Sequence, residues 1–236
     1  MTADRTAAGR RRLLTVAGTA GILLGTAACS SSGGVTGTGS LSYDHVRSTA
    51  QGLAGTGPCP FGLDLPAALK EAGIDRPVTP GSKGEPAVTA DLGNGRPAEP
   101  WPSGFSAPPS MASVPATPPT AWVTCAYTVG SAPVQIDLLA VPENGVAINM
   151  MLPYIQKAGG IGVDQLTRFA EAQPTAGQTK LTPGAESVGV ARVAANGKGD
   201  IALTLSQSSS DAGPEQALTG EALRKATERL AAQLRP

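Results

Sequence analysis

Alternating apolar and polar side chains predict two β-hairpins in the second half of the chain. Residues 121–129 and 133–141 each alternate over the length of a strand, with only a short turn between them. Residues 187–195 and 200–207 repeat this arrangement around a Gly-rich turn at 196–199, whose residues tolerate positive φ. We therefore expect one mostly antiparallel sheet of about four strands.

Apolar residues spaced three and four apart predict five helices around this sheet. The first follows Ser42, a suitable N-cap, and carries Val46, Ala50 and Leu53 on one face. The other four helices are expected at residues 63–72, 145–157, 163–172 and 219–234. Pro153 is expected to kink the helix at 145–157 or to mark its start. This order of elements is typical of an α+β domain in which helices cover an antiparallel sheet.

Residues 77–120 interrupt the pattern. The segment holds 11 of the 21 prolines of the chain and has almost no aliphatic periodicity. Such a composition buries too little apolar surface to offset the entropy lost on ordering. We therefore expect a single α+β domain over residues 41–236, interrupted by a long disordered loop at 77–120.

The N-terminal segment has the pattern of an export signal. Three arginines at 10–12 precede an apolar run over residues 13–28. A helix of that length rises about 24 Å, less than the roughly 30 Å of a bilayer core. We expect a signal peptide at residues 1–28. The arginines resemble a twin-arginine export signal, and an ordinary secretory signal remains the alternative.

The end of this segment, Thr26-Ala27-Ala28-Cys29, resembles the lipobox of bacterial lipoproteins. The resemblance implies cleavage before Cys29 and attachment of lipid to its thiol. Thr26 departs from the pattern, because a larger aliphatic residue is commoner there, and ordinary secretory cleavage is the alternative. Residues 30–40 are rich in Ser, Gly and Thr and suit a flexible tether. The protein is then expected at the extracytoplasmic face of the cell membrane, bound to the lipid bilayer through acylated Cys29.

Composition and charge exclude some partners. The formal net charge of the whole chain is zero, but residues 1–28 hold four Arg and one Asp. Removing them leaves 14 basic and 17 acidic side chains, a net charge of −3. Proteins that bind nucleic acid need a basic stripe or aromatic stacking platforms, whereas this chain is only 3% aromatic. We expect no nucleic-acid partner.

Once Cys29 is assigned to lipid, Cys59 and Cys125 remain as an isolated pair. An oxidising compartment favours a disulfide between them over two free thiols. Such a bond would enclose the whole Pro-rich segment. Closure of a loop of that length contributes about 4 kcal/mol by the chain-entropy estimate.

Two motifs around these cysteines carry a further resemblance. They are CPFGLDL at residues 59–65, continued by the helix-like residues 67–74, and WVTCAY at residues 122–127. In these motifs the chain resembles small secreted lipoproteins of actinobacteria that carry an uncharacterised domain with two paired cysteines. The resemblance covers roughly residues 41–234 in layout. It implies a surface-anchored domain of unknown ligand, with no catalytic residues to carry over.

Few residues suit catalysis. His45 is the single histidine, and the sequence has no nucleophile elbow, phosphate-binding Gly-rich loop or zinc-binding His or Cys motif. We therefore expect no catalytic residue, no metal site and no cofactor. A weak secreted hydrolase remains an alternative.

Apolar anchors favour a binding function instead. Trp101 and Phe105 lie in an extended Pro-rich segment of the kind that docks into a groove of a partner. The alternative is that they fold back and cover the domain. Met150 and Met151 begin an apolar patch that suits a lipid or peptide cleft, and a core helix is the competing interpretation. We expect a non-catalytic binding module for an envelope partner or a small apolar ligand, or alternatively a scaffold that works through the Pro-rich loop.

Overall fold

The computed structural model describes residues 41–53, 55, 57–82, 84, 86–207 and 217–234. All of them belong to one compact unit. The expected signal peptide at 1–28, the expected lipidation site at Cys29 and the expected tether at 30–40 lie outside the described residues.

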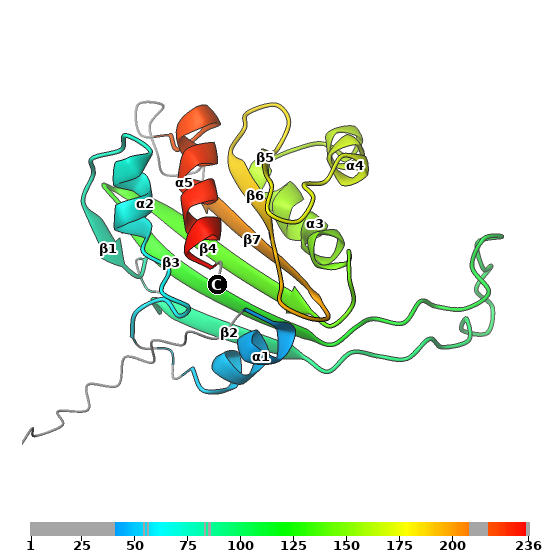
Figure 1. Cartoon of the computed structure of the whole chain (residues 1–236). Helices are drawn as coiled ribbons and strands as arrows, with labels where there is room; N and C mark the ends of the chain where they lie inside the picture. Colours follow the sequence, from blue (N-terminus) through cyan, green and yellow to red (C-terminus); the bar gives the residue numbers. More distant parts are fainter. Residues whose placement is uncertain are drawn as a thin grey trace, which may run out of the picture. The chain divides into compact units, whose positions relative to one another are not determined.

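The described strands form one antiparallel sheet (Figure 1). Its centre consists, in spatial order, of β3 (Thr120–Val129), β4 (Ala132–Val141), β7 (Asp200–Gln207) and β6 (Val188–Val193). One edge is β5 (Thr179–Leu181), which pairs with β6. The other edge consists of two short strands that pair in succession along β3, namely β1 (Val78–Pro80) and β2 (Val88–Gly93).

Both predicted hairpins are confirmed. β3 and β4 are paired from Ala121↔Ala140 to Val129↔Ala132, and β6 and β7 are paired up to Val193↔Ile201. Pairing of β4 with β7 joins the hairpins into one sheet. The expected size of about four strands is wrong, because β1, β2 and β5 bring the sheet to seven strands in the described part of the chain.

The expectation that residues 77–120 form a disordered loop is wrong, because β1 and β2 both lie in this segment. Their backbone groups pair with the edge of β3, and Val88 is the one residue of β2 that is buried. An edge strand needs little apolar surface and accepts a proline, here Pro80, because one side of its backbone faces solvent. Composition did not predict this order, because the strand that orders these residues, β3, lies elsewhere in the chain.

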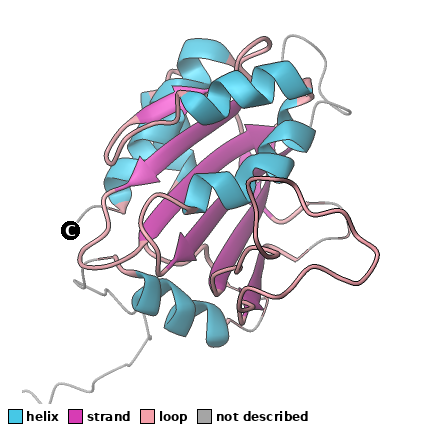
Figure 2. Ribbon diagram, turned by 90° about the vertical axis from the view of Figure 1, so that its right-hand side faces the viewer, coloured by secondary structure: helices cyan, strands magenta, loops and turns pink. Residues whose placement is uncertain are grey.

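Helices cover both faces of the sheet (Figures 1 and 2). One face packs against α1 (Tyr43–Gln51), α2 (Leu65–Glu71) and α5 (Gly220–Gln233). The opposite face packs against α3 (Ala147–Gly159) and α4 (Val163–Glu171). All five predicted helices are confirmed, and α3 continues through Pro153, which lies on its exposed side.

Local chemistry explains where the first two helices begin and where α2 ends. The Ser42 hydroxyl accepts the backbone N–H of His45, and the Asp64 carboxylate accepts that of Ala67. Gly73 follows α2 with φ of 84°, a left-handed conformation that glycine adopts without strain.

Each central strand divides its side chains between two hydrophobic cores. Val123 and Ile136 belong to the core beneath α1, α2 and α5, whereas Leu139 belongs to the core beneath α3. Met151 and Ile155 of α3 are fully buried in this second core. The core-helix interpretation of the methionine patch is therefore confirmed.

Candidate functional site: an uncharged arm and a polar sheet face

Residues 94–119 form an arm that continues the β2–β3 ladder beyond the sheet (Figures 1 and 2). Arg96 pairs with Thr117 through two backbone hydrogen bonds of 2.8 and 2.9 Å. Glu99 pairs with Val114 in the same way, at 3.2 and 2.8 Å. The expected loop is thus a two-stranded extension whose last described backbone pair lies just before its tip.

The two predicted partner-binding residues meet at this tip. The rings of Trp101 and Phe105 stack with centroids 5.3 Å apart and an interplanar angle of 4°. The Trp101 indole donates its N–H to the carbonyl oxygen of Met111 at 3.0 Å, which ties the two sides of the arm together. Both rings pack within the arm and belong to neither hydrophobic core, so the interpretation that they cover the domain is wrong.

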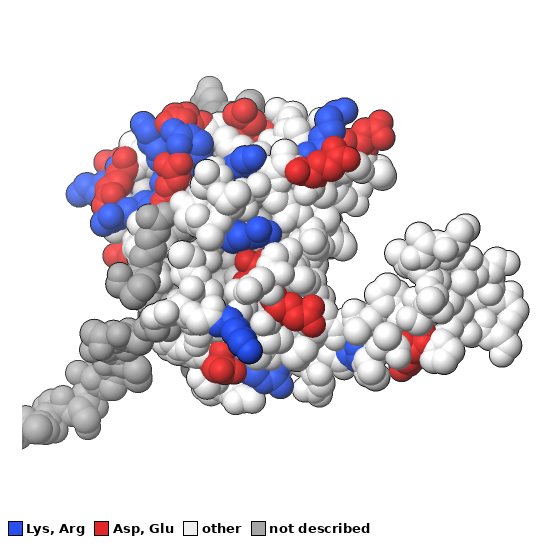
Figure 3. All heavy atoms as spheres, turned by 45° about the vertical axis from the view of Figure 1, so that its right-hand side comes forward, with Lys and Arg blue, Asp and Glu red and all other residues white. Residues whose placement is uncertain are grey.

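The arm tip is apolar, uncharged and exposed. Phe105 is 61% exposed and Met111 is 44% exposed; Val163 on α4 is the other exposed large hydrophobic residue of the described chain. No charged residue occurs between Glu99 and Asp137 in the sequence. Figure 3 accordingly shows charged atoms on the arm only near the domain, with uncharged atoms beyond them.

Arg47 of α1 holds the base of the arm. Its guanidinium donates to the carbonyl oxygens of Gly93 at 3.3 Å and Thr120 at 3.5 Å, one on each strand of the ladder. It also donates to the side-chain oxygen of Asn94 at 3.4 Å. These contacts connect the base of the arm to α1.

The predicted disulfide is present. Cys59 and Cys125 are bonded across 66 residues of sequence, with Cα atoms 5.7 Å apart. Cys125 lies on β3 opposite Val88 of β2, so the bond pins the segment before α2 to the strand pair that carries the arm.

A second group of polar residues lies on the sheet face that α3 covers. Thr124 of β3, Asp137 of β4 and Thr204 of β7 are register partners and form a row across three strands. The next row toward the turn between β3 and β4 contains Gln135 and Ser206. Polar side chains on adjacent strands therefore converge under α3.

Asp137 is the centre of this group and is completely buried. Its Oδ1 accepts three hydrogen bonds: from the indole N–H of Trp122 at 3.0 Å, the hydroxyl of Thr124 at 2.7 Å and the amide of Gln135 at 3.0 Å. A carboxylate oxygen with three donors is strongly held in place.

Tyr154 of α3 closes the group from above. Its hydroxyl forms a hydrogen bond of 3.1 Å with that of Ser206, and its ring meets Trp122 edge to face at 5.7 Å. Burial, followed by the negative charge of Asp137, raises the pKa of Tyr154 above its ordinary value. The phenol is therefore neutral at physiological pH and takes part as a hydrogen-bonding group.

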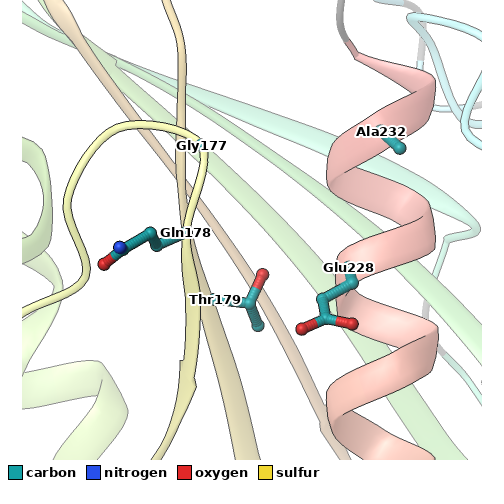
Figure 4. A pocket seen from close by; sticks show the side chains of 5 residues that line it. All are labelled: Gly177, Gln178, Thr179, Glu228 and Ala232. Atoms are coloured by element: carbon teal, nitrogen blue, oxygen red, sulfur yellow. The ribbon is translucent and has the colours of Figure 1, made fainter.

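Cavities on the described surface include the following two. The larger, about 480 Å³, lies between β5 and α5, where Thr179 and Glu228 point toward one another (Figure 4). The Glu228 carboxylate already pairs with Arg224 at 2.5 Å. The smaller, about 270 Å³, is lined by Gln135, Tyr154 and Ser206 of the polar group and lies beside Lys157.

The polar group under α3 was not predicted from the sequence. Gln135 and Asp137 alternate with apolar residues along one strand, and this pattern is the same for a solvent-facing side and for a buried polar cluster. A charged residue in the middle of a strand with apolar neighbours on both sides was the available signal.

His45 does not join this polar group. The His45 ring lies edge-on to Phe61 at 5.7 Å, on the opposite side of the sheet from Asp137. In the ranges that the structure describes, three or more His, Cys, Asp or Glu side chains nowhere gather closely enough to hold a metal ion. Nor does any described helix combine the length and apolar character required to cross a bilayer.

Two features thus stand out in the described chain: the arm tip and the polar sheet face. Comparison with protein families, curated proteins and solved structures finds no match for the chain.

Proposed function

We propose that the protein is a lipid-anchored, non-catalytic binding module of the extracytoplasmic membrane face, which captures a protein partner through the tip of its arm. The observation that carries the proposal is the stacked pair of Trp101 and Phe105 at the tip, with Phe105 61% exposed.

The composition of the tip suits protein recognition. Aromatic side chains dominate the binding energy of protein interfaces, and the cores of interfaces are poor in charge. Of the exposed large hydrophobic residues in the described chain, Phe105 and Met111 are both on the arm. The indole N–H of Trp101 is already bonded to Met111, so covering this ring leaves no donor unsatisfied.

Prolines support the same conclusion. Pro100, Pro102, Pro108 and Pro109 surround the aromatic pair, and each has a restricted φ and no backbone N–H. A restricted segment loses little entropy on docking, which is the reason that Pro-rich segments serve as recognition elements.

Membrane attachment rests on the sequence. The leader at 1–28, Cys29 and the tether at 30–40 resemble those of bacterial lipoproteins. The tether would lead directly into α1, whose Arg47 holds the base of the arm. An anchor there places the domain at the membrane surface and leaves the arm tip free to meet a partner.

Replacing Phe105 with aspartate tests the arm. We expect F105D to reduce cross-linking of the full-length protein to its partner in intact cells at least thirtyfold, because hot-spot aromatics contribute about 2 kcal/mol or more. Val163→Asp is the matched control, since Val163 is 69% exposed and lies on α4. V163D should cross-link like the wild type, and both variants should melt like it. Equal cross-linking by F105D and wild type would refute the arm as the binding element.

Replacing Cys29 with alanine tests the anchor. The wild-type protein should appear in the membrane fraction, with the mass of its N-terminal peptide increased by acyl chains. C29A should move to the soluble fraction, because a single domain without lipid has no comparable hold on the bilayer. An N-terminal peptide of unmodified mass in wild-type protein would contradict lipidation.

A further inference from the structure

Part of the sheet face that carries α3 is open. α3 packs over β4, β6 and β7, whereas α1 packs on the opposite face. On β2, Thr89 and Asp91 are exposed, and on β3, Trp122 and Thr124 are partly exposed. Asp91 pairs with Trp122 and Thr89 pairs with Thr124, so the four side chains share this face. Among the described elements, β2 and β3 therefore form an open strip at the base of the arm.

The indole of Trp122 has a fixed orientation on this strip. Its N–H donates to Asp137 Oδ1 at 3.0 Å, and the Tyr154 ring packs edge to face against it at 5.7 Å. The Tyr154 hydroxyl also forms a hydrogen bond with Asp137. Because the indole N–H is already bonded, a group that covers the exposed part of the ring leaves no donor unsatisfied. Trp122 is thus a rigid aromatic surface.

Negative charge lies on two sides of this aromatic surface. Asp91 is the neighbour of Trp122 on β2, and Asp137 lies behind the indole N–H. None of the ion pairs found in the described chain includes either carboxylate. Arg47, which reaches the same strand pair, belongs to α1 on the opposite face and is engaged by backbone carbonyl oxygens at the base of the arm. The open strip therefore favours a cationic group.

An arginine side chain fits this arrangement best. Cations bind over the faces of aromatic rings, most strongly over Trp, and arginine makes such contacts more often than lysine. A planar guanidinium stacks on an aromatic ring and also donates two parallel hydrogen bonds to a carboxylate. The Cβ atoms of directly opposed residues on antiparallel strands lie about 5 Å apart. One guanidinium can therefore contact the Trp122 ring and the Asp91 carboxylate together.

We propose that Trp122 and Asp91 form a binding site for an arginine side chain of the protein partner that the arm captures. Because it names a feature of that partner, this inference rests on the proposed function, whereas the site itself can be tested with an arginine derivative alone. Asp91 and Trp101 are ten residues apart in the sequence, a distance of at most about 35 Å. A standard interface of about 800 Å² per partner is about 30 Å across. A single protein can therefore reach both the strip and the arm tip.

Titration of the full-length protein in an uncharged maltoside detergent tests the site. The probe is N-acetylarginine amide, and nuclear magnetic resonance follows the indole N–H signals of the two tryptophans of the chain. The Trp122 signal is expected to move until it saturates, whereas the signal of Trp101 on the arm should stay in place as an internal control. N-acetylcitrulline amide has nearly the same shape without the charge and is expected to bind at least fivefold more weakly.

Asp91→Asn keeps the shape of the side chain and removes its charge. It should weaken binding of the arginine probe about two- to fivefold, the effect of losing one exposed ion pair. Cross-linking to the partner in intact cells should fall by a similar factor. Asp75→Asn, at an exposed position after α2, is the matched control and should change neither measurement. Both substitutions should leave the melting temperature unchanged, because both side chains are exposed.

Three outcomes would overturn the site: a Trp122 signal that does not move, equal binding of the citrulline probe, or unchanged binding by D91N. Choline that binds more tightly than the arginine probe would indicate a lipid head group and refute the assignment to arginine. A silent Trp122 signal combined with reduced cross-linking of F105D would refute this site and leave the arm as the binding element. Saturable movement of Trp122 combined with normal cross-linking of F105D would refute the arm and leave the arginine site.

Discussion

Replacing Cys59 and Cys125 together with alanine is expected to lower the free energy of unfolding by about 4 kcal/mol. The disulfide joins residues 66 positions apart and so restricts a long loop in the unfolded chain. For a domain of this size the loss corresponds to a fall of about 10 °C in melting temperature. Calorimetry or circular dichroism of wild-type and variant proteins under identical conditions measures it.

The position of the bond predicts where the structure loosens first. The closed loop contains α2, β1, β2 and the arm, whereas β4, β6 and β7 lie outside it. Hydrogen exchange of the variant should therefore increase most in β1 and β2, which among the described strands pair with β3 alone. A reductant applied to the wild-type protein should reproduce the effect, and a melting curve that does not change on reduction would contradict a stabilising disulfide.

Replacing Gly189 with alanine is expected to destabilise the domain by about 2 to 3 kcal/mol, the upper part of the range for overpacked cores. Gly189 lies on β6 beneath α5, and a Cβ at this position would be 2.0 Å from Thr227 Oγ1 and 2.9 Å from Thr227 Cβ. Thr227 is completely buried, and its hydroxyl donates to the carbonyl oxygen of Leu223 at 2.7 Å. A β-branched side chain held in this way cannot rotate out of the contact, so α5 must move.

A second substitution separates this close contact from a general effect of removing glycine. Thr227→Ala should recover part of the stability that Gly189→Ala loses, and the coupling between them should exceed 0.5 kcal/mol in a double-mutant cycle measured by urea unfolding. Gly159→Ala is the matched control, because its Cβ would meet neighbouring side chains at an ordinary 3.5 Å. If G189A were as stable as G159A, the close approach of α5 to β6 would be disproved.

Side-chain periodicity was sufficient to predict the helices and strands that bury a whole face. The hairpin of β3 and β4 and the helix α5 each present a continuous apolar side to the core, and their bounds agree with the prediction to within one or two residues. Counting cysteines was sufficient to predict the Cys59–Cys125 disulfide, once Cys29 was expected to carry lipid. Hydrophobic patterning therefore revealed the helices and the sheet centre of this α+β domain.

The edge strands could not be predicted from side-chain periodicity. β1 and β5 have three residues each, which is too short for periodicity, and β2 is ordered by backbone pairing with β3. The arm depends on the same pairing, continued through Arg96 and Glu99. The sequence predicted Trp101 and Phe105 as anchors for a partner, whereas their stacking and the exposure of Phe105 were revealed only by the structure of the arm.

The sequence by itself thus determined the class of fold, the two hairpins, the five helices and the disulfide, because each follows from local spacing or from counting residues. Only the tertiary structure decided that Asp137 is buried under α3 opposite Thr204, and that residues 94–119 extend from the sheet. The physical reason is the same for both. A strand pattern specifies which side chains share a face, whereas the order of the strands and the helix covering that face arise from contacts between distant parts of the chain.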